Sequence, residues 1–481
     1  MDSVLIELEN VNFSYLNRPS RTLKDINLKI YQGEYIVITG ESGGGKSTLA
    51  MILAGFIPHI IAGTLEGSVL HQGISSNMLY ISEISQLVGL VQQDPENQLV
   101  CPTVIDEIAF GPENLMINKT EIITRIEHIS NKLEMVHLLQ RSTNRLSGGE
   151  KQKTAIASIL AMNPKVLILD EPSAFLDVPS IKNLLRILKE LNKSQNMTII
   201  ILEHRPELFR NSLTRTIELK NGGIIRDSSN ELFIRQELKI LEEEITRLNN
   251  LKGPETLTDI LEIENINVFY QKFHILRNIS LKIKKGYIYG IIGRNGAGKS
   301  TFLQVLANLI SYNGNIFFRG VNLKNIPSHK LAKEIGIVFQ NPNHQIFEKT
   351  VIDEVLFAPR NFKISQAHKS ADILLQQATL EKYRQFSPFS LSYGEKRRLN
   401  LASVEVYEPE ILLLDEPFIG QSYDNIKYIL ERIKRRKEKQ LTTIIVSHRI
   451  SLLESFSDYL VLFKKGFLQK WYASKQREEE K

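Results

Sequence analysis

The sequence contains one glycine-rich motif twice, and both copies lie in the same surroundings. The motif follows the pattern G-x-x-x-x-G-K-[ST], which is typical of loops that bind phosphate groups. The first copy is Gly40, Glu41, Ser42, Gly43, Gly44, Gly45, Lys46, Ser47 and Thr48, and the second is Gly293, Arg294, Asn295, Gly296, Ala297, Gly298, Lys299, Ser300 and Thr301. Each copy follows a short apolar run, at residues 35–38 and 287–292, and precedes a helical pattern. This strand–loop–helix context predicts two phosphate-binding loops, and therefore a duplicated nucleotide-binding protein.

The two halves of the chain align over most of their length. Residues of the same type recur in the same order and at nearly constant spacing: Lys46 with Lys299, Gln93 with Gln340, Asp170 with Asp415, and His204 with His448. Such a pattern indicates tandem duplication. At 481 residues, the chain is also longer than one hydrophobic core usually serves. We therefore predict two domains, at residues 1–229 and 259–481.

Between these domains, residues 230–258 are predicted to form a helical extension of the first domain followed by a linker. Apolar side chains recur there at helical spacing and form one stripe: Ile234, Leu238, Leu241, Ile245 and Leu248. The Lys-Gly-Pro segment at residues 252–254 ends the helix. A partner-binding coiled coil is an alternative, although about three heptads is short for one.

Each half begins with strand-like residues and continues with fully apolar runs. The β-rich starts lie at residues 5–11 and 261–266, and the apolar runs lie at residues 166–169, 198–202, 411–414 and 442–446. Apolar runs that alternate with helices are typical of buried parallel strands. We therefore expect an α/β fold with a mostly parallel sheet in each domain.

The composition fits a globular protein and leaves the class of partner open. Hydrophobic residues make up 42% of the chain and charged residues 24%, and no apolar run approaches the roughly 18 residues that span a bilayer. The first residues lack the pattern of a signal peptide. The single cysteine, Cys101, excludes an internal disulfide and fits a reducing cytosol. The net charge of +6 suits an anionic membrane surface or RNA without choosing between them.

The glycine-rich loops predict how a nucleotide is held. Backbone N–H groups at the start of a helix point at an anion, and glycines let the backbone approach it closely. We expect Lys46 and Lys299 to reach the terminal phosphates, and Ser47 and Ser300 to bind Mg²⁺. The cofactors predicted are therefore ATP and Mg²⁺.

Acidic pairs end two of the apolar runs, at residues 170–171 and 415–416, and each pair is followed by proline. The C-terminal end of a parallel strand lies near the phosphate loop of a neighbouring strand. Asp170 and Asp415 suit the metal or its bound water, while Glu171 and Glu416 suit a general base that polarises the attacking water. Two histidines, His204 and His448, follow the next strands, where they could contact the γ-phosphate and align the water with the glutamate.

Across nearly its whole length, the chain resembles the ATP-binding subunits of ATP-binding cassette (ABC) proteins, which implies two tandem P-loop NTPase domains, each with a helical subdomain. Residues 146–150 and 391–395 look like the signature motif, with glutamate where glutamine is common. The resemblance implies ATP contacts for Ser147, Gly148, Gly149, Ser392 and Gly394, metal and water contacts for Gln93 and Gln340, and adenine stacking for Tyr15 and Tyr270.

In this family the domains pair head to tail, and each ATP lies between one phosphate loop and the partner's signature. Because both halves lie on one chain, the resemblance implies pairing within the chain. The signature that would complete the first site has Tyr393 where glycine is usual, and Ser422 stands where the first half has Asp177. We therefore expect the second site, with Lys299 and Glu416, to hydrolyse ATP faster. The alternative is that the Tyr393 side chain points away from the phosphate.

The segments after the two glutamines point to a subfamily. Residues 94–99 and 341–346 are each followed by a Thr-Val-Ile-Asp-Glu stretch, at residues 103–107 and 350–354. This pattern is similar to that of the energy-coupling-factor (ECF) importers of vitamins, vitamin precursors and metal ions. In those importers the region docks on coupling helices of a membrane subunit. The resemblance implies a peripheral ATPase on the cytoplasmic face of the cell membrane, with the integral coupling and substrate-binding subunits on separate chains.

Two alternatives belong to other classes. One is a tandem ATPase that acts on ribosomes as a translation factor, which usually carries a long basic helical arm between its domains. The stretch here is short and holds Glu242, Glu243 and Glu244, so we expect no nucleic-acid partner. The other is the fused ATPase of a sugar importer, which shares the mechanism and differs only in cargo.

Overall fold

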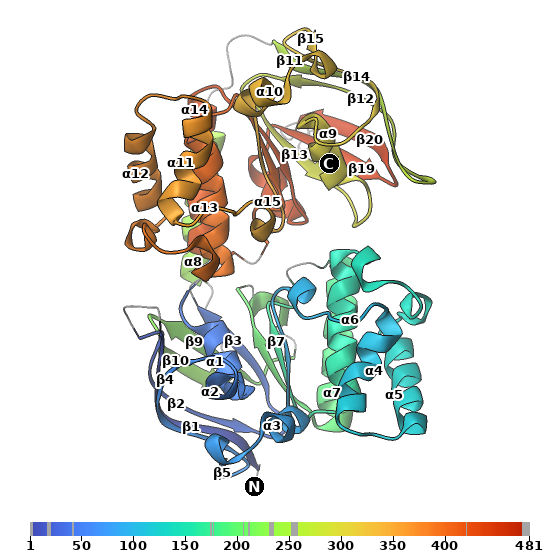
Figure 1. Cartoon of the computed structure of the whole chain (residues 1–481), viewed down its shortest axis with the longest axis vertical. Helices are drawn as coiled ribbons and strands as arrows, with labels where there is room; N and C mark the ends of the chain where they lie inside the picture. The colour runs from blue at the N-terminus through green and yellow to red at the C-terminus, as the bar shows by residue number, and fades with distance from the viewer. Residues whose placement is uncertain are drawn as a thin grey trace. The chain divides into compact units, whose positions relative to one another are not determined.

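The computed structural model describes residues 3–16, 21–40, 43–173, 176, 178–204, 206–209, 212–229, 235–251, 258–419 and 421–473. The chain divides into two compact units, Met1–Arg235 and Gln236–Lys481. Corresponding elements follow one another in the same order in both units (Figure 1). Within the described ranges, no helix has the length and apolar character needed to cross a bilayer.

The first unit contains an antiparallel sheet and a mostly parallel one. The antiparallel sheet has the order β2-β1-β4-β5, formed by β1 (Val4–Tyr15), β2 (Leu23–Tyr31), β4 (Gly63–His71) and β5 (Ile74–Ser75). The second sheet has the order β10-β9-β3-β8-β7-β6, formed by β3 (Tyr35–Gly40), β6 (Val88–Val91), β7 (Val166–Asp170), β8 (Thr198–Leu202), β9 (Arg215–Lys220) and β10 (Gly223–Ser229). Its strands pair in parallel except β9 with β10.

Helices of the first unit fall into two groups. Those connecting the strands are α1 (Lys46–Leu53), α2 (Phe56–His59), α3 (Ile81–Leu87) and α7 (Val178–Gln195). A separate group stands beside the sheets and consists of α4 (Val104–Asn114), α5 (Lys119–Lys132) and α6 (Gly148–Ala161), as Figure 1 shows. This group is the helical subdomain that the family resemblance implied, and it lies in the chain between the phosphate loop and β7.

The second unit repeats this plan. Its antiparallel sheet has the order β12-β11-β14-β15, from β11 (Asp259–Tyr270), β12 (Phe273–Lys284), β14 (Asn313–Phe318) and β15 (Val321–Asn322). Its larger sheet has the order β16-β17-β18-β13-β19-β20, from β13 (Ile288–Ile292), β16 (Ile335–Val338), β17 (Ile411–Asp415), β18 (Thr442–Val446), β19 (Tyr459–Lys464) and β20 (Phe467–Ala473). Its helices are α8 (Arg235–Asn249), α9 (Lys299–Leu306), α10 (Ser328–Glu334), α11 (Val351–Asn361), α12 (Ala367–Gln377), α13 (Tyr393–Glu405), α14 (Tyr423–Glu438) and α15 (Ile450–Phe456).

The parallel strands are apolar throughout because both faces of each sheet are covered. In β3, Tyr35 and Val37 point into the core formed with α4–α7, whereas Ile36 and Ile38 point into the core formed with β1, β2 and α1. A strand buried on both faces needs apolar residues at every position rather than at alternate ones. The predicted α/β class, with a mostly parallel sheet in each half, is confirmed.

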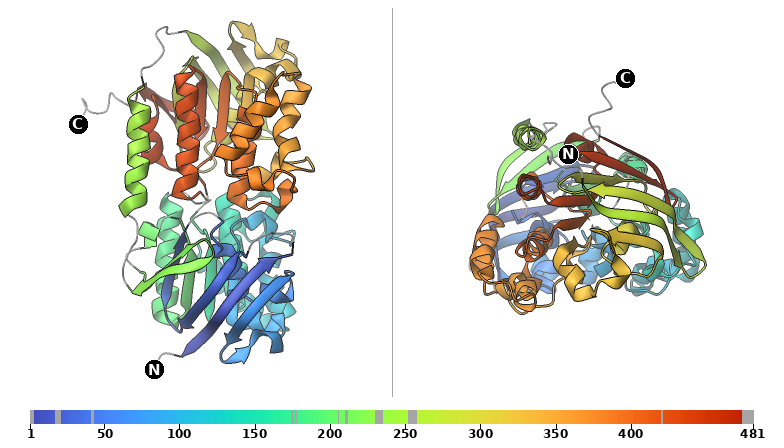
Figure 2. Two further views of the ribbon diagram at one scale, coloured as in Figure 1. Left: turned by 90° about the vertical axis from the view of Figure 1, so that its left-hand side faces the viewer. Right: turned by 90° about the horizontal axis from the view of Figure 1, so that it is seen from above.

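Helix α8 packs on the second unit. Leu248 is fully buried in the second unit's main core, and Leu241 and Ile245 pack against that core from the same side of the helix. The Asn249 side chain donates a hydrogen bond to the Ser455 carbonyl, at 2.8 Å. The last three members of the predicted apolar stripe thus share one face, but the interpretation of this helix as an extension of the first domain is wrong. Figure 2 shows α8 along one side of the second unit.

Other parts of the predicted stripe and linker lie outside the described residues. Ile234 and the Lys-Gly-Pro segment at residues 252–254 lie outside the described residues, as does the side chain of Leu238. The stripe therefore rests on its last three members, which share one face of α8. Sequence periodicity identifies such a face but cannot say which neighbour covers it.

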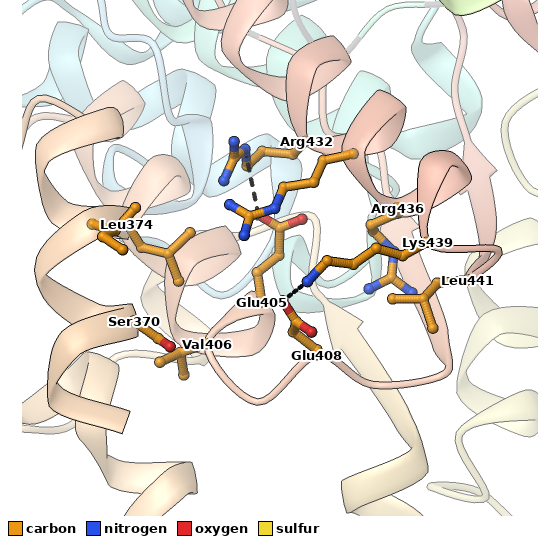
Figure 3. A pocket seen from close by; sticks show the side chains of 11 residues that line it. Ser370, Leu374, Glu405, Val406, Glu408, Arg432, Arg436, Lys439 and Leu441 are labelled. Carbon is orange, nitrogen blue, oxygen red and sulfur yellow. Dashed lines mark hydrogen bonds and ion pairs between the residues drawn. The ribbon is translucent and has the colours of Figure 1, made fainter. Parts of the chain in front are cut away.

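The units differ at the C-terminal end of the α6 and α13 helices. In the second unit, Glu405 is buried 3.9 Å from the Arg432 Nε atom and lines a cavity of about 60 Å³ (Figure 3). Arg436 and the exposed pair formed by Lys439 and Glu408 also line it. Burial raises the pKa of Glu405, against the lowering effect of Arg432 and Arg436. The matching positions of the first unit carry leucine and isoleucine, at residues 160, 187 and 191, in its apolar core.

Candidate functional site

Each phosphate loop turns from a central strand directly into a helix. The turn ends at Gly45, with φ of +100°, and at Gly298, with φ of +95°, immediately before α1 and α9. A Cβ atom at these positions would lie 2.6 Å from a Leu23 methyl group and 2.7 Å from a Leu276 methyl group. Glycine is therefore required both by the left-handed backbone and by the close approach of the neighbouring strand. Glu41 and Ser42 of the first loop lie outside the described residues.

The lysine of each loop folds back across its own loop. The Lys46 ammonium donates to the Gly40 carbonyl at 2.8 Å, and the Lys299 ammonium donates to the carbonyls of Gly293 at 2.8 Å and Arg294 at 3.1 Å. Both lysines are 6% exposed. Each loop thus combines a buried positive charge with the N-terminus of a helix, an arrangement that attracts polyphosphate.

Carboxylates converge on the first loop because the parallel strands end at one edge of the sheet. Asp170 is buried at the end of β7 and accepts a hydrogen bond from Ser47. Glu171 accepts a hydrogen bond from the Gln93 amide nitrogen at 2.9 Å and lies 2.9 Å from the His204 Nε2 atom. Gln93 and His204 lie 78 and 33 positions from Glu171 in the chain, and the structure brings these three side chains, all candidate site residues from the sequence, together.

The two carboxylates of the first site have pKa values shifted in opposite directions. Burial raises the pKa of Asp170 to about 7, helped by the charge of Glu171 and opposed by the Ser47 hydroxyl. Burial also acts to raise the pKa of Glu171, but the charge and hydrogen bond of His204, with Lys46 and Gln93, hold it below its ordinary value. Glu171 therefore has the lower pKa of the two and is the first of them to ionise as the pH rises.

The second site has the same residues with different contacts. The Ser300 hydroxyl donates to Asp415 at 3.0 Å, and Glu416 accepts from the backbone N–H of His448 at 3.0 Å. The His448 Nε2 atom lies 3.2 Å from the other Glu416 oxygen. Burial raises the pKa of Glu416 to about 8, against the lowering effect of Lys299. Burial likewise raises the pKa of Asp415.

The two sites differ in what the glutamine does. Gln93 holds Glu171 through its side chain, whereas the described part of the second unit contains no hydrogen bond between Gln340 and Glu416. The histidines differ as well. In the first site the backbone N–H of His204 donates to the buried Glu203 carboxylate at 3.0 Å. The position of the second unit that matches Glu203 is Ser447, which has no carboxylate. The matched residues are thus present twice but are positioned differently.

The two predicted adenine-stacking residues end matched strands and have different surroundings. Tyr15 ends β1, with its hydroxyl 3.0 Å from the Thr48 hydroxyl of the first loop and its ring edge-on to Phe13. Tyr270 ends β11 and is exposed. Tyr15 therefore lies beside a phosphate loop, while Tyr270 presents its ring to solvent.

The signature segments begin helices α6 and α13. Ser147 caps α6 and Ser392 caps α13, and each cap is completed by the glutamate three residues later, Glu150 or Glu395. The glutamate accepts from the serine backbone N–H, at 2.7 Å in the first unit and 2.8 Å in the second. This capping box needs an acceptor side chain at the third helical position, which glutamate supplies here and glutamine would also supply. Gly148, Gly149 and Gly394 lie in the first turns of these helices, where backbone N–H groups are unpaired by the helix itself.

The Tyr393 side chain folds back into its own unit. Its hydroxyl donates to the Gln340 carbonyl at 3.3 Å and accepts from Arg397 at 3.2 Å. This orientation matches the alternative in which the ring points away from the N–H groups at the start of α13, so the structure gives the crowding argument no support. Ser422 caps α14, whereas Asp177, to which it was matched, lies outside the described residues.

The Thr-Val-Ile-Asp-Glu stretches shape an exposed loop in each unit. Their buried glutamates, Glu107 and Glu354, each accept two backbone N–H groups from the preceding loop, at distances of 2.7–3.0 Å. The loop then presents an apolar side chain outward, Val100 at 67% exposure in one unit and Phe347 at 57% in the other. An exposed aromatic residue lies ten positions later in each unit, Phe110 or Phe357. The Phe347 and Phe357 rings meet edge to face, 4.5 Å apart.

Comparison with known proteins identifies relatives over nearly the whole chain. A family described as ABC transporter matches residues 23–174 and 276–419. A Methanosarcina mazei protein, provisionally named as an ABC transporter ATP-binding protein, is 33% identical over 96% of this chain and 94% of its own length. YkoD of Bacillus subtilis, whose name gives HMP/thiamine import as a provisional role, is 33% identical over 96% of this chain and 90% of its own length. CbiO1 from Clostridium perfringens, part of the transporter complex cbiONQ, is 30% identical over 46% of this chain and 91% of its own, with a TM-score of 0.42.

Proposed function

Because the chain belongs to the ABC transporter family, as an ATP-hydrolysing ATP-binding protein with two nucleotide-binding domains, we propose that it is the energy-coupling subunit of an importer of the ECF type. Its cargo is a vitamin, a vitamin precursor or a metal ion. The name of YkoD, which includes HMP/thiamine import, supports this class of cargo. The chain operates on the cytoplasmic face of the cell membrane, held there by integral subunits on other chains.

The observation that carries the proposal is the pair of outward apolar residues that recurs in both units. Val100 with Phe110, and Phe347 with Phe357, occupy matched positions after the glutamines, and a buried glutamate shapes each loop. Exposed apolar clusters rimmed by polar residues mark protein interaction sites. Two copies of one cluster suit two similar helices of an integral membrane subunit, with each unit contacting one of these helices.

In the hydrolysis reaction, each unit supplies the same chemical groups. Lys46 and Lys299 bind the terminal phosphates, and Glu171 and Glu416 take the proton of the attacking water. His204 and His448 orient these glutamates from 2.9 Å and 3.2 Å. These roles rest on the buried carboxylates that lie beside each loop.

Magnesium fits the oxygen groups at both loops. Each loop pairs a serine hydroxyl with a buried aspartate, Ser47 with Asp170 and Ser300 with Asp415. Mg²⁺ is bound by one or two carboxylates or hydroxyls together with substrate phosphates and waters. When bound, the ion would neutralise phosphate charge, and the Gln93 and Gln340 side chains would help to hold it or its water.

We further propose, on the family resemblance, that the signature of one domain completes the ATP site of the other. The N-termini of α6 and α13, each capped by serine, supply N–H donors for the γ-phosphate. The second site, with Lys299 and Glu416, hydrolyses ATP faster than the first. Ser422, in place of the aspartate of the first unit, supports this order.

The test is affinity recovery of the tagged chain from detergent-solubilised native membranes, with partners identified by mass spectrometry. We expect a polytopic coupling subunit and a small substrate-binding membrane subunit, whose identity then names the cargo. The matched variant replaces Phe347 and Phe357 by serine, and we expect both partners to be lost from the recovered material. Recovery of ribosomal proteins without any membrane partner would refute the importer and favour a role on the ribosome.

A further inference from the structure

Arg397 connects three segments of the second unit that carry proposed functional residues. It lies in α13, five residues after the signature serine Ser392, and is 6% exposed. Its guanidinium donates to the backbone carbonyl of Glu416 and, at 2.6 Å, to that of Gln340. It also donates to the Tyr393 hydroxyl at 3.2 Å, with the Tyr393 ring centre 5.2 Å from the guanidinium carbon. One side chain therefore links the start of α13, the Gln340 segment and the residue after β17.

Arg397 contacts Glu416 at a residue whose backbone conformation is unusual. Glu416 has φ of +50°, in the left-handed region that non-glycine residues rarely adopt. Such a conformation persists only where the surroundings hold it. The N–H of Glu416 donates to the Val446 carbonyl at 2.9 Å, and the carbonyl of Glu416 accepts from Arg397. Both polar backbone groups of this residue are thus held, which sets the direction in which its side chain leaves the chain.

The first unit holds its glutamate in another way. Glu171 has the same left-handed backbone, with φ of +49°, and its N–H donates to Leu202. The position that matches Arg397 is Gln152, which is fully buried and makes no side-chain hydrogen bond within the described part of the chain. There, the side chain of Gln93 contacts the Glu171 carboxylate directly.

We propose that Arg397 is a positioning residue for ATP hydrolysis, which orients Glu416 through its backbone and so replaces in the second unit the contact that Gln93 makes in the first. Through Tyr393, the same guanidinium ties the position of Glu416 to the signature segment. The tyrosine in the signature thereby has a use: it is part of the support for Arg397. This inference rests on the proposed role of Glu416 as the base.

Steady-state ATP hydrolysis in a Glu171→Gln background tests the inference, because the remaining turnover then reports the second glutamate. Arg397→Gln introduces the side chain that the first unit carries at this position. We expect kcat to fall roughly tenfold, the factor that one charge-assisted hydrogen bond supplies, with KM for ATP unchanged. Arg397→Lys retains a donor and should recover part of kcat. The control is Lys396→Gln, which changes the neighbouring residue of the same helix and removes a hydrogen bond to Asn343.

A double-mutant cycle with Glu416→Gln separates positioning from a merely structural role. If Arg397 acts through Glu416, Arg397→Gln adds little once Glu416 is replaced. An equal further loss in that background, or a joint change of KM and the unfolding midpoint, overturns the inference. If Glu416→Gln does not lower turnover in the Glu171→Gln background, the proposed base is wrong. If Glu416→Gln lowers it and Arg397→Gln does not, the positioning role alone fails.

Discussion

Helix α8 offers a direct test of which unit it stabilises. Leu248 is fully buried in the second unit's core, so Leu248→Ala removes apolar contacts that the surroundings cannot fully replace. Buried leucine-to-alanine changes cost about 3–5 kcal/mol when the site does not collapse. Because α8 lies at the edge of the core rather than inside it, we expect the lower end, about 3 kcal/mol.

The single tryptophan of the chain makes the measurement specific. Trp471 lies in β20, which pairs with β19 in the second unit's sheet, so its fluorescence reports the unfolding of that unit. With a urea m-value of about 2–3 kcal/mol/M, the loss corresponds to a midpoint lowered by about 1–1.5 M. Leu309→Ala is the matched control, because Leu309 belongs to the same unit but is 54% exposed; its midpoint should stay within about 0.2 M of the parent. An unchanged fluorescence midpoint for Leu248→Ala would show that α8 does not support the second unit.

Three further predictions follow from the sites and surfaces. Glu416→Gln should abolish most ATP turnover and Glu171→Gln should cost less, measured as phosphate release at saturating ATP; the reverse order contradicts the proposed inequality of the sites. Phe357→Ser should lower recovery of membrane partners at least about tenfold, since a truncated hot-spot aromatic costs about 2 kcal/mol or more, whereas the same change at the exposed Phe389 should not. Because burial raises the pKa of Glu405, its contribution to stability is present below about pH 4.5 and is lost as pH rises through the raised value. Glu405→Gln should therefore gain stability relative to the parent as the pH rises above about 4.5 in urea titrations; a gap that does not change with pH refutes this.

Sequence reasoning identified the residues whose roles depend on their immediate neighbours. A phosphate loop needs glycines, a lysine and a hydroxyl at consecutive positions, so Lys46, Ser47, Lys299 and Ser300 are visible without a structure. The parallel strands are equally visible, because burial on both faces leaves uninterrupted apolar runs. The duplication then indicates which of the remaining residues recur together, and it located both acidic pairs.

Sequence reasoning missed the residues that act through distant partners. Arg397 stands in the second signature helix where the first has Gln152, and nothing near it in the chain reveals that its partners are the carbonyls of Gln340 and Glu416. The sequence placed Glu107 and Glu354 in a subfamily pattern but did not show what they contact. In the structure their carboxylates accept hydrogen bonds from backbone N–H groups of the preceding loop and so hold its conformation. A comparison of unlike residues at matched positions, rather than like ones, is the signal that could have found Arg397.

The amino-acid sequence by itself determined the fold class, the repeat and the chemistry available at each loop, because these follow from short-range patterns of apolar, glycine and charged residues. Only the tertiary structure decided which unit α8 covers, where the Tyr393 ring points and which donors hold Glu171 and Glu416. Those outcomes depend on contacts between residues far apart in the chain, such as Gln93 with Glu171 and Asn249 with Ser455. Packing selects among the faces and orientations that local patterns leave equally allowed, and so two nearly identical sets of motifs acquire different surroundings.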